Sequence, residues 1–130
     1  PSMSTLNVDA LVGNTSANAI TVRGEGSATT SLQQGLAKAW LKMDGSGTAE
    51  INDSFNNSSI TDDGTGQFAI TISTAFASAN YSTTGSQNLS TSNLAISDFT
   101  TTVHKTFIRN DAATFADPDH LSTSNFGDLA

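Results

Sequence analysis

Residues 36–55, LAKAWLKMDGSGTAEINDSF, and residues 59–85, SITDDGTGQFAITISTAFASANYSTTG, decide the fold class of this chain. Two glycine-rich runs, Asp44–Gly47 (DGSG) and Asp62–Gly66 (DDGTG), separate apolar runs of strand length. Asp-Gly and Gly-x-Gly sequences reach positive φ without a Cβ clash, so both runs predict hairpin turns. The stretch is typical of a β-sandwich or β-barrel. The bulky side chains predicted to fill its core are Trp40, Phe55, Phe68, Phe76 and Tyr81.

The segment before the first turn, SLQQGLAKAWLKM (31–43), fits two periodicities. Leu36, Trp40 and Met43 lie at helical spacing, and alanine, leucine, lysine and methionine favour helix. Read as a strand, the segment places Leu41 and Met43 on one face and Trp40 on the other. Because a turn and another strand-like run follow at once, we predict a strand.

The composition predicts a thin core. Hydrophobic residues make up 36% of the 130 residues and charged residues 13%, while serine, threonine and asparagine dominate the remainder. Disordered chains usually carry more charge and lack strand periodicity, so disorder is not expected in the middle of the chain. We therefore expect one all-β domain whose core is completed by neighbouring subunits.

Charge and composition also exclude several classes of function. The formal net charge is −7 and no basic cluster occurs, which argues against nucleic acid as a partner. No apolar run approaches the roughly 20 residues of a membrane span, so no membrane partner is expected. The start, PSMSTLNV, lacks the features of a signal peptide. The chain has no cysteine, hence no disulfide or thiolate chemistry.

Three parts are predicted along the chain: an N-terminal strand arm or stalk with a linker (1–30), a β-sandwich knob (31–109) and an acidic C-terminal segment (110–130). In the arm, STLNVDAL (4–11) alternates like a half-buried strand, and AITVR (19–23) predicts a second strand. Two such strands are marginal alone and need partners. The residues predicted to anchor the arm in a trimer or on a shell are Leu6, Val8, Leu11, Ile20 and Val22.

The second half of the chain is patterned more weakly. Residues 87–97 predict a polar loop. Residues 101–109 predict a strand with His104, Thr106 and Ile108 on one face. The acidic end carries spaced apolar residues that cap this subunit's core or anchor the segment on another subunit. These are Phe115, Leu121, Phe126 and Leu129.

The polar residues predict neither catalysis nor a cofactor. Asp44, Asp62 and Asp63 lack the spacing of a calcium loop, and ordinary turn chemistry explains them. The loop 117–120 with two aspartates and a histidine is a looser metal candidate, for which a solvated loop is the simpler interpretation. His104 has no frame for a nucleophile around it. We therefore predict no enzyme, no metal and no cofactor.

Two blocks of the sequence resemble a known family. GLAKAW (35–40), a Gly-x-Gly turn, Ser-Phe, SITDDGTGQFAITI (59–72) and A-x-A-N-Y (77–81) follow one another as in a domain of tailed-bacteriophage virion proteins. This domain recurs in tail-fibre-like and particle-surface structural proteins of marine and cyanobacterial phages. STLNVDALVGNTSANAITV (4–22) resembles the opening of such proteins. Together the blocks span residues 3–86, and the likeness fades beyond Gln87.

The resemblance implies a homotrimeric all-β module, with a sandwich or jelly-roll-like knob on a short β stalk. The implied function is a bacteriophage capsid decoration or cement protein on the virion surface, assembled in the host cytoplasm and bound to the major capsid protein or other virion proteins. A chain of this length leaves no room for the long shaft of a fibre, which favours decoration. The alternative is a tail-fibre or receptor-binding knob that recognises host glycans.

Overall fold

The computed structural model describes residues 3–16, 18–24 and 26–130. The chain divides into two compact units, Pro1–Leu36 and Ala37–Ala130. The described residues contain ten strands and no helix. The first unit thus extends to Leu36, beyond residue 30, where the predicted arm and linker end.

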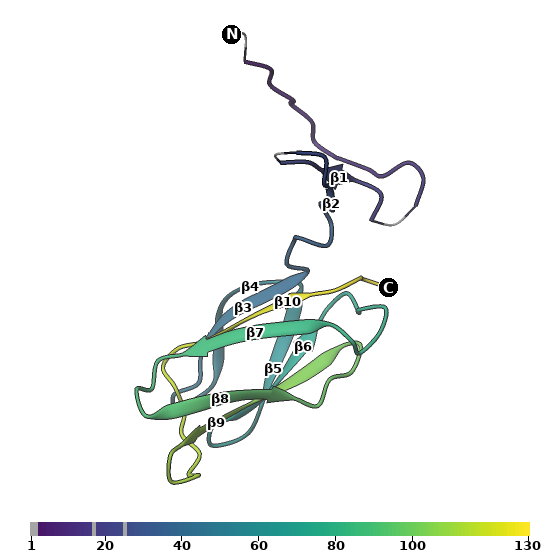
Figure 1. Cartoon of the computed structure of the whole chain (residues 1–130). Coiled ribbons are helices and arrows are strands. Elements are labelled where there is room, and N and C mark those ends of the chain that lie inside the picture. Colours follow the sequence, from purple (N-terminus) through teal and green to yellow (C-terminus); the bar gives the residue numbers. More distant parts are fainter. Residues whose placement is uncertain (1–2, 17, 25) are drawn as a thin grey trace. The chain divides into compact units, whose positions relative to one another are not determined.

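The second unit is a sandwich of two four-stranded antiparallel sheets (Figure 1). One sheet has the order β4-β3-β10-β7 and the other β5-β6-β9-β8. The prediction of an all-β sandwich is confirmed, whereas the strand order does not show a jelly roll. The strands are β3 (Ala39–Asp44), β4 (Glu50–Phe55), β5 (Asn57–Gly64), β6 (Gln67–Ile72), β7 (Ser82–Gln87), β8 (Ser92–Ser97), β9 (Val103–Asn110) and β10 (Leu121–Phe126).

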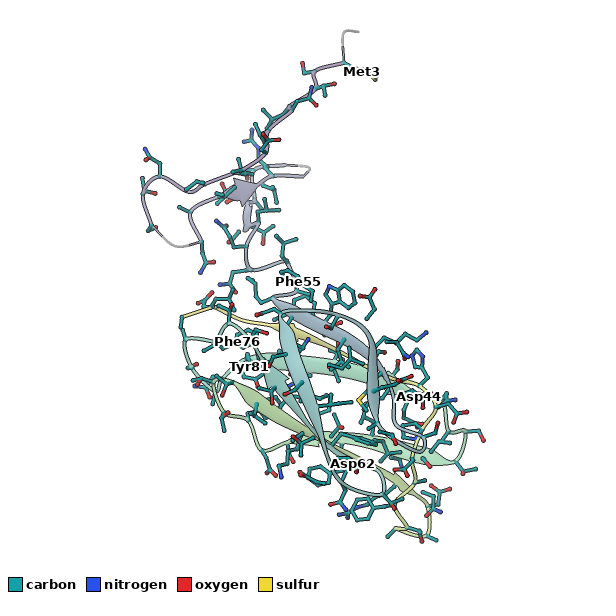
Figure 2. The ribbon with its side chains drawn as sticks, turned by 180° about the vertical axis from the view of Figure 1, so that it is seen from behind. Met3, Asp44, Phe55, Asp62, Phe76 and Tyr81 are labelled. Carbon is teal, nitrogen blue, oxygen red and sulfur yellow. The ribbon has the colours of Figure 1, made fainter. Side chains whose placement is uncertain are left out.

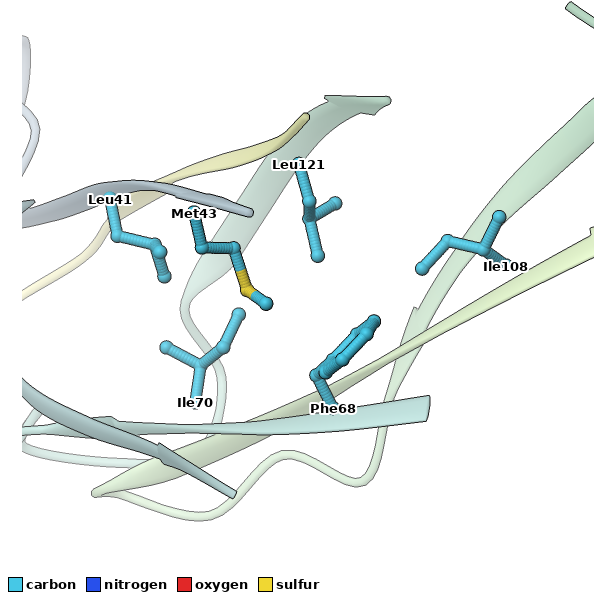
Figure 3. Close-up of a cluster of buried hydrophobic side chains, with 6 residues drawn as sticks. All are labelled: Leu41, Met43, Phe68, Ile70, Ile108 and Leu121. Carbon is cyan, nitrogen blue, oxygen red and sulfur yellow. The ribbon is translucent and has the colours of Figure 1, made fainter. Parts of the chain in front are cut away.

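Strand alternation places one face of each sheet in the core. Strand β3 buries Ala39, Leu41 and Met43, which confirms the strand interpretation of that segment. Figure 3 shows side chains of the two sheets pointing toward one another across the main cluster. That cluster consists of Leu41, Met43, Phe68, Ile70, Ile108 and Leu121.

Two of the predicted core aromatics lie on the surface instead. Trp40 is 38% exposed and Phe55 is 55% exposed, so neither belongs to the core of the single chain. They are directly opposite each other on β3 and β4. The reason is the strand period: once Leu41 and Met43 face inward, Trp40 must face outward. The other three predicted core aromatics, Phe68, Phe76 and Tyr81, are buried.

A second buried cluster lies between the sheets and is built around two stacked rings. Phe76 and Tyr81 stack with their ring centroids 4.1 Å apart. The Tyr81 hydroxyl donates a hydrogen bond to the carbonyl of Val103 at 3.0 Å, so its polar end is satisfied. Phe99 meets the Tyr81 ring edge-on at 5.2 Å. Ala39 and Ile72 complete this cluster.

Both predicted hairpin turns are confirmed. Two adjacent residues later in the chain, Asp117 and Pro118, each accept a hydrogen bond from one of the turns. The Asp44 carboxylate accepts hydrogen bonds from the backbone N–H and the hydroxyl of Ser46. Gly45 donates its N–H to the carbonyl of Pro118 at 2.9 Å. Gly66, at a φ of 63°, donates its N–H to the Asp117 carboxylate at 2.6 Å. The two turns therefore lie at the same end of the sandwich.

The chain changes sheets at Asn56, between β4 and β5. Its φ of 55° lies in the left-handed region, which asparagine tolerates better than most residues. The Asn56 side-chain amide donates to the carbonyls of Lys38 and Thr74, and its oxygen accepts the N–H of Thr74. This single side chain thus fixes the corner where the two sheets separate.

The C-terminal segment corrects the predicted division of the chain. Residues 121–126 form β10, which pairs with β3 on one side and β7 on the other. Leu121, Thr123 and Asn125 point into the core. The segment 110–130 is therefore part of the sandwich. The predicted loop 87–97 is also wrong in part, because Ser92–Ser97 forms β8 and pairs with β9.

The first unit contains little regular structure. Its two strands, β1 (Thr21–Val22) and β2 (Thr30–Ser31), form a short antiparallel pair. Residues 3–16 form no strand, so the first predicted strand is absent from the single chain. The second is shortened to Thr21–Val22. An isolated strand has no partner for its backbone groups, which explains why the alternating pattern alone does not produce one.

Candidate functional site

The arm exposes most of its large apolar side chains. Leu6 is 76% exposed, and Val8, Leu11 and Val22 are also exposed, whereas Ile20 is half-buried. Met3 and Val12, which were not among the predicted anchoring residues, are exposed as well. Exposed apolar residues gathered in one segment are typical of an interaction site. Among the described parts of the chain, the arm is the one that carries the most of them.

A second exposed apolar feature lies on the outer face of the sheet β4-β3-β10-β7. The Trp40 and Phe55 side chains form a cross-strand pair there, and Figure 2 labels Phe55 at the end of β4. The same figure places Asp44 and Asp62 in the turns farther along the sandwich. Toward β10 and β7 the face becomes a shallow polar surface. It is formed by Thr84, Ser86, Ser122 and Ser124.

The outer face of the other sheet carries a larger groove along β8 and β9, with a volume of about 620 Å³. Paired residues of the two strands form its floor. Ala95 lies opposite Phe107, and Asn93 lies opposite Arg109. Ser97 and Asp98 line one end, and the turn after β9 lines the other. The groove is thus apolar at its centre and polar at both ends.

Two local interactions shape the second end of the groove. The Asn110 side-chain oxygen accepts the N–H groups of Ala112 and Thr114, which folds the turn back on β9. The Arg109 guanidinium carbon lies 4.3 Å from the centroid of the Phe115 ring, a cation–π contact. The contact orients a planar cation at the end of the groove.

Beneath the same sheet, His104 is fully buried. Its ring lies 6.2 Å from that of Phe99 and 6.3 Å from that of Tyr81. Neither ring nitrogen has a hydrogen-bond partner. Burial lowers the pKa of His104 from 6.5 to about 4, and burial raises the pKa of Tyr81 to about 12. Both groups are therefore neutral near pH 7, in agreement with the predicted strand histidine.

The acidic residues considered as metal ligands in the sequence do not gather into one site, and several of them make structural hydrogen bonds or ion pairs instead. The hydrogen bonds from Ser46 lower the pKa of Asp44, and the Asp63 carboxylate pairs with the Lys105 ammonium at 2.7 Å. Asp117 holds the Gly66 turn. Within residues 3–16, 18–24 and 26–130, no group of three or more histidine or acidic side chains is arranged to hold a metal ion. That part of the chain also offers no helix able to cross a membrane.

The groove could not be predicted because residues 87–97 were interpreted as a polar loop, and strand β8 forms one of its two sides. The alternation of Phe107 and Arg109 on one face of their strand was visible in the sequence, and the structure confirms it. What the sequence did not show is that Asn93, Ala95 and Ser97 lie beside them. The alternation of SNLAIS (92–97), with Leu94 and Ile96 on the opposite face, is the signal that identifies this strand.

Comparison of the chain with protein-family models, with curated proteins and with solved structures finds no match.

Proposed function

We propose that this protein is a bacteriophage virion structural protein, a homotrimer that decorates and stabilises the capsid. The observation that carries the proposal is the arm, whose Leu6, Val8 and Leu11 are exposed in a chain with few large apolar residues. The resemblance of residues 3–86 to phage virion proteins supports the same class. The sandwich projects from the virion surface as a knob, and the major capsid protein or another virion protein receives the arm.

The energetics favour an arm that becomes ordered on binding. Burial of apolar surface contributes about 25 cal/mol per Å², so a buried leucine or valine is worth about 1.5–3 kcal/mol. A segment without regular structure loses conformational entropy when it is fixed, and several such side chains are needed to offset that cost. A trimer presents three arms at once, which multiplies the affinity for a shell of repeated subunits.

The test is sedimentation with purified capsids that lack the protein. We expect the full chain to cosediment, and the variant Leu6→Ser with Val8→Ser to bind at least about a hundredfold more weakly, since two apolar contacts are lost. The matched control, Thr5→Ser with Asn7→Ser, changes the intervening positions and should bind like the wild type. A chain of residues 37–130 should fold and not bind. Capsid binding by that knob alone would contradict the role of the arm.

The second candidate function is a tail-fibre or receptor-binding knob for host glycans. The observation that favours it is the groove along β8 and β9. The two functions differ in which part of the chain makes the contact. If the second function is correct, the chain of residues 37–130 binds host cells and does not bind capsids.

A further inference from the structure

We propose that the groove along β8 and β9 is a binding site for a short neutral oligosaccharide. The inference rests on the second candidate function, glycan binding at this groove, and narrows the kind of glycan that it takes. It rests on the shape of the groove, its aromatic floor, the state of its polar side chains and its charge.

The shape of the groove follows from the pairing of β8 with β9. At its centre the small, exposed Ala95 lies opposite Phe107, so no bulky neighbour on β8 covers the aromatic side chain. The turns on both sides limit its length, one beginning at Asp98 and the other formed by residues 110–113. Its volume of about 620 Å³ is within the range of roughly 300–1,000 Å³ that small-molecule sites have.

The polar side chains of the groove have hydrogen-bonding capacity to spare. Among the described residues, no carboxylate pairs with Arg109, whose contact is the Phe115 ring. The ring covers the face of the guanidinium and leaves its N–H groups at the edge. The carboxylates of Asp98 and Asp111 accept no hydrogen bond from the described chain. Donors and acceptors therefore surround an apolar floor.

Charge selects the kind of ligand. The groove holds one cation, Arg109, and two carboxylates, Asp98 and Asp111, in a chain of net charge −7. Anionic ligands are repelled on balance. The two carboxylates lie at opposite ends and do not converge on a cation. A neutral ligand with an apolar face and a rim of hydroxyl groups fits best, and a pyranose has both: its C–H face stacks on an aromatic ring while its hydroxyls bond to Asp, Asn and Arg.

The test is an NMR titration of the full chain, isotopically labelled, with maltotriose, cellotriose, mannotriose and N,N′,N″-triacetylchitotriose, and with sialyllactose as the anionic probe. We expect at least one neutral trisaccharide to shift the amide resonances of β8 and β9. Phe107→Ala should weaken that binding about tenfold or more, because the stacking surface is lost. Ala95→Trp fills the floor from an exposed strand position and should abolish binding without removing a core side chain.

The matched control is Trp40→Ala, which removes an exposed aromatic from the outer face of the other sheet and should leave the affinity unchanged. The proposal is overturned if none of the four neutral trisaccharides shifts these resonances. It is equally overturned if Trp40→Ala abolishes binding while Ala95→Trp does not, or if sialyllactose binds more tightly than every neutral probe. Capsid binding by the arm is measured separately, so either proposal can fail alone.

Discussion

A chain that ends at Asp119 is expected not to fold. Strand β10 lies between β3 and β7, and β7 has no other neighbour in its sheet. Its removal takes away the hydrogen bonds that β10 makes with β3 on one side and with β7 on the other, and each such bond contributes about 0.5–1.5 kcal/mol. It also removes Leu121 from the main cluster, where a leucine-sized void costs about 2–5 kcal/mol. Together these losses are comparable to the roughly 5–15 kcal/mol that stabilises a typical domain.

Circular dichroism and thermal unfolding measure this directly. The shortened chain should lose its sheet signal and show no cooperative transition. The control is the chain of residues 37–130, which lacks a larger piece of the sequence but keeps every strand of the sandwich. It should unfold cooperatively. A cooperative transition in the chain ending at Asp119 would show that β10 is dispensable.

Acid is expected to destabilise the sandwich through His104. The pKa of this group is about 4 in the folded protein and 6.5 when unfolded. Between these values the unfolded chain binds more protons, so the free energy of unfolding falls as the pH falls. The contribution of neutral His104 is fully present above pH 6.5 and is lost by about pH 4. At about 1.4 kcal/mol per pKa unit, the loss amounts to about 3 kcal/mol.

Urea unfolding between pH 7 and pH 4.2 checks the prediction. The hydrogen bonds from Ser46 hold the pKa of Asp44 below 3.8, so that carboxyl stays largely ionised over this range. His104→Leu removes the titrating group from its buried position and should flatten the pH dependence. His120→Gln, on a partly exposed residue, should keep the wild-type dependence. If the free energy of unfolding of His104→Leu depends on pH as steeply as that of the wild type, groups other than His104 cause the loss of stability.

The parts of the fold that the sequence predicted are those with strong local signals. The Asp-Gly turns, the alternation in residues 101–109 and the all-β class depend on backbone preferences and on the side-chain period of a strand. Strand β10 lacked such a signal, because Thr123 and Asn125 occupy buried positions next to a single buried leucine. Pairing on both sides, and the hydrogen bond from Thr83 to Asn125, compensate for the missing apolar residues.

Trp40 was misplaced for a different reason. The prediction assumed that the largest apolar side chain fills the core, although tryptophan is less often fully buried than leucine or methionine. The strand period allowed only one face of β3 inward, and the face with Ala39, Leu41 and Met43 is the more uniformly apolar one. The groove forms only when β8 pairs with β9. Local sequence patterns can indicate each strand but do not show which strands pair.

The proposed trimer connects the exposed arm with the shortage of large apolar residues. Each copy leaves Leu6, Val8 and Leu11 exposed, and three copies can bury these side chains against one another or on a shell. Assembly would then add to the stability of each subunit, and the midpoint of thermal unfolding would rise with protein concentration.

Sedimentation equilibrium of the full chain at micromolar concentration tests this most directly. We expect a species with three times the 13.4 kDa mass of one chain. A stable monomer of 13.4 kDa across the same concentrations would contradict it.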